Sequence, residues 1–285
     1  MFVGRHDVRT RGGCAAFSRN ELVIVTGVLM VLAMVAGAFI VTSRQSKEYR
    51  CTANLKTLGL AMNLYETDNQ ERLPPAVFVY GRGHSEVWDG LIFPFVPLGR
   101  NGLVQKHLLL CPADTITNRD SEWRRRTYAM PEHNNDAANW PLSSQNATGL
   151  GVTWNTGMAK WAFWTNYVSI TTNYPEADTN TAVVSFKISA MVRKMIKAPA
   201  STLLLTEHAI HENIAFAAGG ATISGPTYHL EDTISPNQYH GGKINYLLVD
   251  GHVELIYPSE SVGLRDPRNV SDKKLPNIWT IYPDD

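Results

Sequence analysis

Glu21 is the residue whose type and position most clearly suggest chemistry, because it is a carboxylate at the very start of a long apolar run. The twenty residues from Leu22 to Val41 carry no charge, and a helix of that length spans about 30 Å, the thickness of one hydrocarbon core. A carboxylate in such a segment costs on the order of 3 kcal/mol at mid-bilayer, and less near the interface, unless a cation pairs with it. The sequence therefore predicts a membrane anchor in which Glu21 requires a cationic partner.

Residues 1–16, which precede this run, are short and basic, with small residues immediately before Phe17. A secretory signal has its small residues after the apolar stretch, whereas here charged residues follow that stretch. A lipid anchor on Cys14 would need the apolar stretch in front of the cysteine, and here it lies behind. The sequence therefore predicts that residues 1–16 are a leader that is neither a secretory signal nor a lipoprotein signal.

The segment AFSRNELVIVTGVLMVLAM resembles the N terminus of type IV prepilins and of the pseudopilins of type II secretion, in which a small residue precedes Phe and Glu follows four residues later. The resemblance implies that a prepilin peptidase cuts between Ala16 and Phe17, that the new amino group of Phe17 is methylated, and that the helix packs into a filament. The ammonium group of Phe17 in a neighbouring subunit would then be the cation for Glu21. The chain departs from the family at Ala16, where Gly is preferred, and at Arg19 and Asn20, where apolar residues are usual.

Beyond the membrane the helix is expected to continue, giving one long helix over residues 17–72 with its transmembrane part at about 22–41. Its outer half has apolar residues at the spacing of one buried stripe, namely Leu55, Leu58, Ala61, Met62 and Tyr65. Asp68 and Asn69 followed by the prolines at 74 and 75 predict its end. Such a stripe needs a globular head to pack against.

Residues near the C terminus predict a β-hairpin, with strands at Ile244–Val249 and Val253–Tyr257. Asp250 and Gly251 between them are typical of a two-residue turn in which both positions accept a positive φ. His240, which is separated from Asp250 by nine residues, completes a pattern that resembles the C-terminal His-x9-Asp-Gly signature of prepilin-like proteins. We expect a structural role for the signature, with His240 hydrogen-bonded near the Asp250-Gly251 hairpin and fixing the edge of the sheet.

The cysteines predict a disulfide between Cys51 and Cys111, because Cys14 would leave with the leader and an isolated pair in an exported head is a disulfide candidate. Closing a loop of about sixty residues is worth roughly 4 kcal/mol in the chain-entropy model. Two buried thiols are the alternative.

Residues 73–285 are long enough for one α+β head with insertions. A segment at about 133–181 is rich in Asn, Thr and tryptophan, and its indoles either stack on sugar faces or, as we expect, close a secondary core. Strands are predicted at Thr181–Ile188 and Ser201–Thr206, with a helix at AMVRKMIKA that ends at Pro199. The tryptophans of this segment are Trp140, Trp154, Trp161 and Trp164.

Several metal-ligand types gather in the last third of the chain, but their spacing forms no strong motif. His208 and His211 would share a face only if TEHAIHE were helical, whereas the preceding residues predict a strand that enters a loop. We expect structural roles, no bound metal and no cofactor. The residues considered are Glu207, His208, His211, Glu212, His240, Asp250 and His252.

Sequence motifs of enzymes and of nucleic-acid binding are weak. The chain lacks a Gly-x-Ser-x-Gly elbow, a phosphate-binding glycine loop and a His-Glu-x-x-His helix, so we expect no catalytic residues. Its formal charge is +0, and the arginines at 124–126 are expected to be a solvated loop face. We therefore predict neither an enzyme nor a nucleic-acid partner.

Taken with the resemblance, these features predict a pilin-like α+β protein whose long helix packs on an antiparallel sheet. Its expected function is that of a structural subunit of a type IV pilus or of a filament related to type II secretion. The expected partners are prepilin peptidase, other pilin-like subunits, an inner-membrane assembly platform and the lipid bilayer, with a single pass through the bacterial inner membrane and the head periplasmic or extracellular. The alternative is a membrane-anchored protein that binds a glycan or a metal, or a hydrolase, with the helix serving only as a tether.

Overall fold

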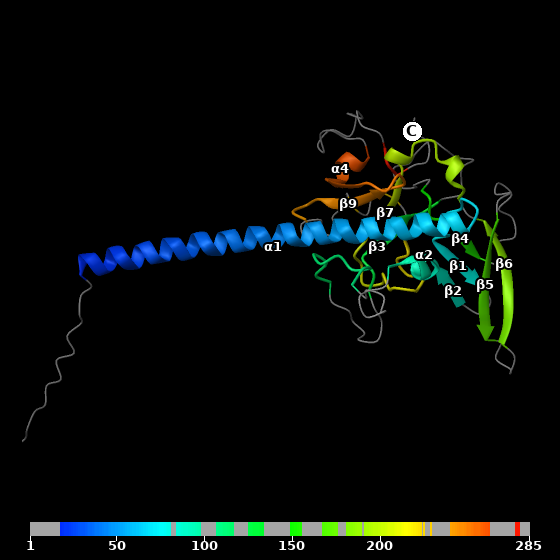
Figure 1. Ribbon diagram of the computed structural model, residues 1–285, viewed down its shortest axis with the longest axis horizontal. Helices are drawn as coiled ribbons and strands as arrows, with labels where there is room; N and C mark the ends of the chain where they lie inside the picture. Colours follow the sequence, from blue (N-terminus) through cyan, green and yellow to red (C-terminus); the bar gives the residue numbers. More distant parts are fainter. Residues whose placement is uncertain are drawn as a thin grey trace, which may run out of the picture. The chain divides into compact units, whose positions relative to one another are not determined.

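The protein is an α+β protein with a long N-terminal helix and mixed β-sheets, as Figure 1 shows for the computed structural model. The structure describes residues 18–80, 84–97, 107–116, 125–133, 149–155, 167–175, 181–189, 191–223, 225, 229, 240–262 and 277–279. The chain divides into two compact units, Met1–Gln45 and Ser46–Asp285. Ala16 and Phe17, the residues of the predicted cleavage, lie outside the described residues, as do Trp140, Trp161 and Trp164.

Helix α1, Arg19–Asp68, is one unbroken helix of 50 residues, close to the predicted bounds. Its segment Arg19–Ala38 is long and apolar enough to cross a membrane, and none of that segment is buried. Large apolar side chains are exposed all along it, from Leu22 at 57% to Met34 at 70%. An apolar surface of this size is stable in water only if something covers it.

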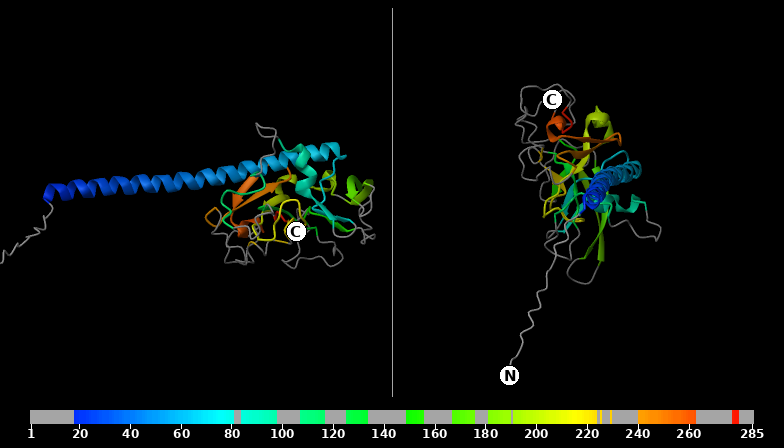
Figure 2. Two further views of the ribbon diagram at one scale, coloured as in Figure 1. Left: turned by 90° about the horizontal axis from the view of Figure 1, so that it is seen from below. Right: turned by 90° about the vertical axis from the view of Figure 1, so that its left-hand side faces the viewer.

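The later part of α1 supplies one wall of the core of the Ser46–Asp285 unit. Leu55, Leu58, Ala61 and Met62 are fully buried and Tyr65 is 4% exposed, so the predicted stripe is confirmed. Figure 2 shows this part of the helix lying along the strands, and the buried stripe belongs to the same cluster as Leu205 and Leu247 of the sheet. Gly59 makes the approach close, because a Cβ there would lie 3.1 Å from the Leu247 side chain.

The main sheet has five strands in the order β10-β9-β7-β3-β8, and it is mixed. The first four pair antiparallel as predicted, but β8 pairs parallel with β3. The prediction of a purely antiparallel sheet was therefore wrong. The connection between β7 and β8 crosses to the far edge of β3, so β8 runs opposite to β7 and parallel to β3. The strands are β3 Tyr128–Pro131, β7 Leu203–Glu207, β8 Thr222–Ile223, β9 Ile244–Leu248 and β10 Val253–Ile256.

Two smaller sheets accompany the main sheet. In the three-stranded one, β1 (Val77–Tyr80) pairs antiparallel with β2 (His84–Val87) and parallel with β4 (Thr153–Asn155). In the other, β5 (Tyr167–Pro175) and β6 (Thr181–Ser189) form an antiparallel pair. The strands predicted at 181–188 and 201–206 thus correspond to β6 and β7. Strands β4 and β5 fall within the predicted insertion.

Short helical turns complete the fold, and one of them corrects a prediction. The segment AMVRKMIKA is not an α-helix, because within its described part, residues 191–198, only Arg193–Met195 is helical, as the 3-10 turn η3. Backbone pairing outweighs helical propensity here: Met191 accepts a hydrogen bond from the amide of Leu73, and the amide of Arg193 donates to Glu71. The other turns are α2 Trp88–Ile92, η1 Phe93–Phe95, η4 Pro199–Ser201 and α4 Pro258–Ser261.

Strands β9 and β10 form the predicted hairpin, but its turn differs from the prediction. Only Gly251 has a positive φ, at +95°, and Asp250 does not. The amide of Gly251 donates to Leu248 O over 2.9 Å, and the amide of Leu248 donates to His252 O over 2.9 Å. The loop therefore has three residues with glycine last, an arrangement in which only the glycine must be left-handed.

Candidate functional site

The first turn of α1 is closed by a reciprocal pair of hydrogen bonds between Ser18 and Glu21. The amide of Ser18 donates to Glu21 Oε2 over 2.8 Å, and the amide of Glu21 donates to Ser18 Oγ over 3.3 Å. This is a capping box, which satisfies amides that have no partner within the helix. The spacing Ser-x-x-Glu was visible in the sequence and would have predicted it. Glu21 is exposed and, within the described part of the chain, forms no ion pair with a cation.

The predicted disulfide between Cys51 and Cys111 is present, with 5.0 Å between the two Cα atoms. It joins α1 to the segment at residues 107–116, and Asn54 reinforces the junction because its Nδ2 donates to Leu110 O over 3.0 Å. The amide of Cys111 donates to Thr127 Oγ1 over 3.0 Å. Both cysteines are buried, at 0% and 2% exposure.

His240 and Glu207 lie against this disulfide. His240 Nε2 is 3.4 Å from Cys111 Sγ and donates to Glu207 Oε1 over 3.1 Å. Burial opposes a charged imidazole, but the hydrogen bond and negative charge of Glu207 outweigh it and raise the pKa of His240. His240 was expected to hydrogen-bond near the hairpin and fix the edge of the sheet. It lies just before hairpin strand β9, but its partner Glu207 belongs to the inner strand β7 and not to the edge strand β10. His240 precedes β9 and the turn follows β9, so the antiparallel pairing of β9 with β7 brings His240 to Glu207 at the end of β7 instead.

Glu207 is held from both sides by Asn245. The amide of Asn245 donates to Glu207 Oε2 over 2.9 Å, and Asn245 Nδ2 donates to Oε1 over 3.2 Å. Thr52 of α1 donates from its hydroxyl to Asn245 Oδ1 over 3.1 Å. The carboxylate at the disulfide is therefore fixed by the helix and the sheet together. Sequence reasoning considered Glu207 and His240 as ligand types but had no signal that placed them at the cysteines.

The other histidines considered from the sequence do not join this cluster. The segment after β7 is not helical, as expected, and it leaves His208 buried and His211 exposed. Burial, with the charges of His229 and Arg126, lowers the pKa of His208 to about 3. His252 is partly exposed and contacts Asp250 over 2.6 Å and Glu254 over 3.2 Å. The histidine that contacts Asp250 of the signature is therefore His252 and not His240.

Arg125 and Arg126 are buried, so the prediction of a solvated arginine face was wrong for both; Arg124 lies outside the described residues. Arg125 lies 2.8 Å from Asp114, and Arg126 lies 2.7 Å from Asp89 and over the ring of Trp88. A buried guanidinium needs such partners, since an unpaired charge in the interior is costly. Arg125 thus joins the segment at residues 107–116, and Arg126 joins α2, to the residues just before β3.

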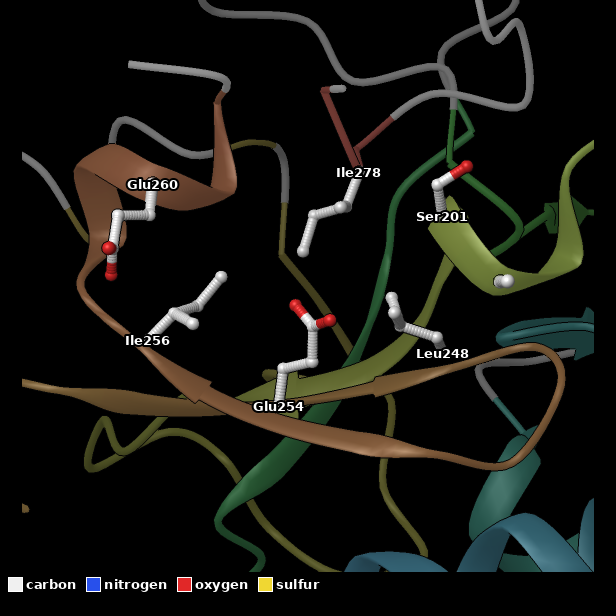
Figure 3. A pocket seen from close by; sticks show the side chains of 7 residues that line it. Ser201, Leu248, Glu254, Ile256, Glu260 and Ile278 are labelled. Atoms are coloured by element: carbon white, nitrogen blue, oxygen red, sulfur yellow. The ribbon is translucent and has the colours of Figure 1, made fainter. Parts of the chain in front are cut away.

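A cavity of about 240 Å³ opens between β9, β10, α4 and η4 (Figure 3). Glu254 points into the space between Ile256, Leu248 and Ile278, while Glu260 folds back to accept the amide of Tyr257 over 2.8 Å. Glu254 also contacts His252, so each of the two carboxylates at the cavity has a partner within the protein. The cavity is lined by Ala200, Ser201, Leu248, Glu254, Ile256, Glu260 and Ile278.

Comparisons of the chain with protein-family models, with curated proteins and with solved structures gave no significant match. The grounds for a functional proposal are therefore the sequence, the α1 surface with Glu21, and the residues around the disulfide.

Proposed function

We propose that this chain is a pilin-like or pseudopilin-like structural subunit, cut by a prepilin peptidase before Phe17 and assembled into a type IV pilus or a filament related to type II secretion. Its α1 would cross the bacterial inner membrane once, with the head periplasmic or extracellular. The observation that carries the proposal is the change of character along α1. One continuous helix is apolar and exposed over Arg19–Ala38 and has a single buried stripe from Cys51 onward.

The exposed apolar surface of α1 supports assembly, because lipid can cover it before assembly and neighbouring helices can cover it afterwards. Gly27 and Gly37 face open space, since a Cβ built on either would meet nothing within 4 Å. Small residues on a membrane helix allow another backbone to approach closely. A filament packed through these helices would bury the surface that a single chain leaves exposed.

Glu21 supports a filament over a plain tether. As part of the capping box it accepts one hydrogen bond from the amide of Ser18, which does not neutralise its charge. An uncompensated carboxylate is unfavourable in the membrane, and the ammonium group created on Phe17 of a neighbouring chain would supply the missing cation. Two chains paired in this way are held in one axial register.

The disulfide supports export of the head. Disulfides persist in oxidising compartments such as the bacterial periplasm and are rare in the cytosol. The Cys51–Cys111 bond lies in the part of α1 that packs into the head. A head outside the cytoplasm is the arrangement that filament assembly requires.

The test separates the two roles of Glu21. Glu21→Gln removes the charge but keeps an oxygen that can accept the Ser18 amide, whereas Ser18→Ala keeps the charge and removes half of the capping box. Each full-length variant is expressed in bacteria with a prepilin peptidase, and intact mass and filament yield are measured. We expect methylated Phe17 at the N terminus in all of them. Filament yield should fall about tenfold or more in Glu21→Gln, since a factor of ten corresponds to only ~1.4 kcal/mol, and should stay near the parent in Ser18→Ala.

Two outcomes contradict the proposal. If Met1 is retained in the parent chain, the helix is a plain anchor and the tethered binding protein or hydrolase becomes the better interpretation. If Glu21→Gln assembles as well as the parent while Ser18→Ala does not, Glu21 serves only to cap the helix.

A further inference from the structure

We propose that Cys51, Cys111, His240 and Glu207 form a Zn²⁺ site when the disulfide is reduced. The same four side chains would then provide two alternative cross-links between α1 and the sheet. One is the covalent bond of the oxidised protein, and the other is a metal ion in the reduced protein. This inference concerns the head and does not depend on filament assembly.

The distances between the ligand atoms suit a tetrahedral ion. Each of the four residues offers one ligand atom, and these atoms all lie within 4.8 Å of one another. His240 Nε2 lies 3.4 Å from Cys111 Sγ and 3.1 Å from Glu207 Oε1. Bonds of about 2.3 Å to sulfur and about 2.0–2.1 Å to nitrogen and oxygen separate tetrahedral ligand atoms by about 3.3–3.8 Å. His240 Nε2 is therefore already within a few tenths of an ångström of these separations from Cys111 Sγ and Glu207 Oε1. Ligand atoms as far apart as 4.8 Å would have to approach by about 1 Å, and the two freed sulfurs would have to move apart, to complete the site.

The donor set selects the metal. Two thiolates and one imidazole favour Zn²⁺ over the hard cations Mg²⁺ and Ca²⁺, which prefer oxygen ligands. All four residues are buried, so water competes weakly for the ion. The ion would also compensate the charge of the Glu207 carboxylate and of the two thiolates, which are costly in the interior without a cation.

The surrounding hydrogen bonds orient the donors in the way that metal sites require. Asn245 holds both oxygens of Glu207, at 2.9 Å and 3.2 Å. The amide of Ala113 donates to Cys111 Sγ over 3.4 Å, and the amide of Cys111 is fixed by Thr127 Oγ1 over 3.0 Å. Such outer contacts fix the direction of the ligands and tune affinity.

The chemistry balances with a dithiol as the reductant. The dithiol gives two electrons and two protons to the Cys51–Cys111 bond and becomes a disulfide itself, leaving two cysteine thiols. Zn²⁺ then displaces the two thiol protons to solvent. The proton on His240 Nε2 passes to solvent, and the neutral ring coordinates through Nε2 with its one proton on Nδ1. The hydrogen bond from Nε2 to Glu207 is then replaced by bonds from both groups to the metal.

The experiment uses the full chain in detergent micelles, with Cys14→Ser in every sample so that only Cys51 and Cys111 can supply thiols. The protein is reduced with a water-soluble phosphine, which becomes the phosphine oxide, and is titrated with Zn²⁺ against a competing chromophoric chelator. We expect one equivalent to bind to the reduced chain and none to the oxidised chain. His240→Ala should lower affinity by at least about tenfold, because a ligand is lost. His252→Ala, which changes a histidine between two carboxylates elsewhere, should leave affinity unchanged.

A second measurement avoids the risk that a variant fails to fold. In the reduced parent chain, Zn²⁺ should slow the alkylation of both Cys51 and Cys111 at least about tenfold, and a chelator should reverse the effect, because a coordinated thiolate is a poor nucleophile. Equal alkylation rates with and without Zn²⁺ would overturn the proposal. So would Zn²⁺ binding that is equally strong in the oxidised chain or that His252→Ala weakens as much as His240→Ala.

Discussion

The guanidinium of Arg126 lies 2.7 Å from the carboxylate of Asp89, and neither side chain is exposed to solvent. Arg126 Nε also donates to Asn213 Oδ1 over 2.8 Å, and Asp89 Oδ2 accepts the amide of Phe216 over 2.8 Å. The pair therefore joins α2, the segment just before β3 and the loop that follows β7. Burial raises the pKa of Asp89 and lowers that of Arg126, and each charge partly offsets the shift of the other.

Removing one partner of this pair should be strongly destabilising. Arg126→Met leaves a buried carboxylate without its cation, which costs about 3–5 kcal/mol. The matched control is Arg193→Met, because Arg193 pairs with Glu66 at 2.9 Å and, although the Glu66 side chain is 6% exposed, that of Arg193 is 36% exposed. Solvent screens this pair more than the Arg126 pair, so its loss should be smaller. Urea unfolding of the full chain in micelles measures both free energies. Equal losses of unfolding free energy in the two variants would mean that burial does not increase the contribution of the Arg126 pair to stability.

Reduction of the Cys51–Cys111 disulfide in the presence of a chelator should lower the free energy of unfolding by about 4 kcal/mol, because a loop across a sequence separation of 60 is released in the unfolded chain. The double variant Cys51→Ala with Cys111→Ala should lose a similar amount and should not respond to the reductant. Denaturant midpoints of oxidised, reduced and variant chains check this. A loss below about 1 kcal/mol would show that contacts such as Asn54 to Leu110 already hold the junction.

The protein should lose stability as the pH falls below about 6.5. Burial lowers the pKa of His208 to about 3 and that of His229 to about 4, from ordinary values of 6.5. The unfolded chain therefore binds these protons first, so the stability is complete above pH 6.5 and declines towards pH 4 by about 1.4 kcal/mol per pH unit for each histidine.

The variant that isolates one of these groups is His208→Gln. Its unfolding free energy, measured at several pH values, should decline less steeply than that of the parent by about 1.4 kcal/mol per pH unit. The control His252→Gln changes a partly exposed histidine whose pKa is raised despite partial burial, because Glu254 and Asp250 accept its hydrogen bonds. An unchanged slope in His208→Gln would refute the assignment.

Gly251 should be the sensitive residue of the hairpin turn, because its φ is +95° and a Cβ there would meet nothing within 4 Å. Any cost of a side chain is then conformational. Gly251→Ala is expected to destabilise by about 1–2 kcal/mol, and Gly251→Asn by less, since asparagine tolerates left-handed backbone. Thermal unfolding of both variants tests the order. If alanine and asparagine cost the same, the turn does not require the left-handed conformation.

The sequence alone was sufficient to predict those features whose signals are local and repeated. The apolar run, the stripe from Leu55 to Tyr65 and the strand-like segments that flank Asp250 and Gly251 each reflect the geometry of one helix or one hairpin, so local patterns reveal them without knowledge of the rest of the chain. Cys51 and Cys111 were paired because few cysteines remained. The capping box of Ser18 and Glu21 was equally local, and its spacing could have been recognised.

Tertiary structure decided everything that depends on segments far apart in the chain. The segment after β6 pairs with the residues that follow α1 and so does not form the helix that its composition favours. Arg125 and Arg126 could be buried only because Asp114 and Asp89 lie opposite them. These outcomes depend on long-range hydrogen bonds and charge pairs, for which the sequence has no periodic signal.

The residues around the disulfide show the same division most clearly. Their chemical types were plain in the sequence, and the pairing of Cys51 with Cys111 was predictable from their number. That His240 and Glu207 lie on this disulfide follows from the register of β7 against β9 and from the packing of α1 on that sheet. Sequence thus determined which chemistry was available, and only the folded chain determined which groups share one buried site, because proximity there is set by strand register and helix packing and not by spacing along the chain.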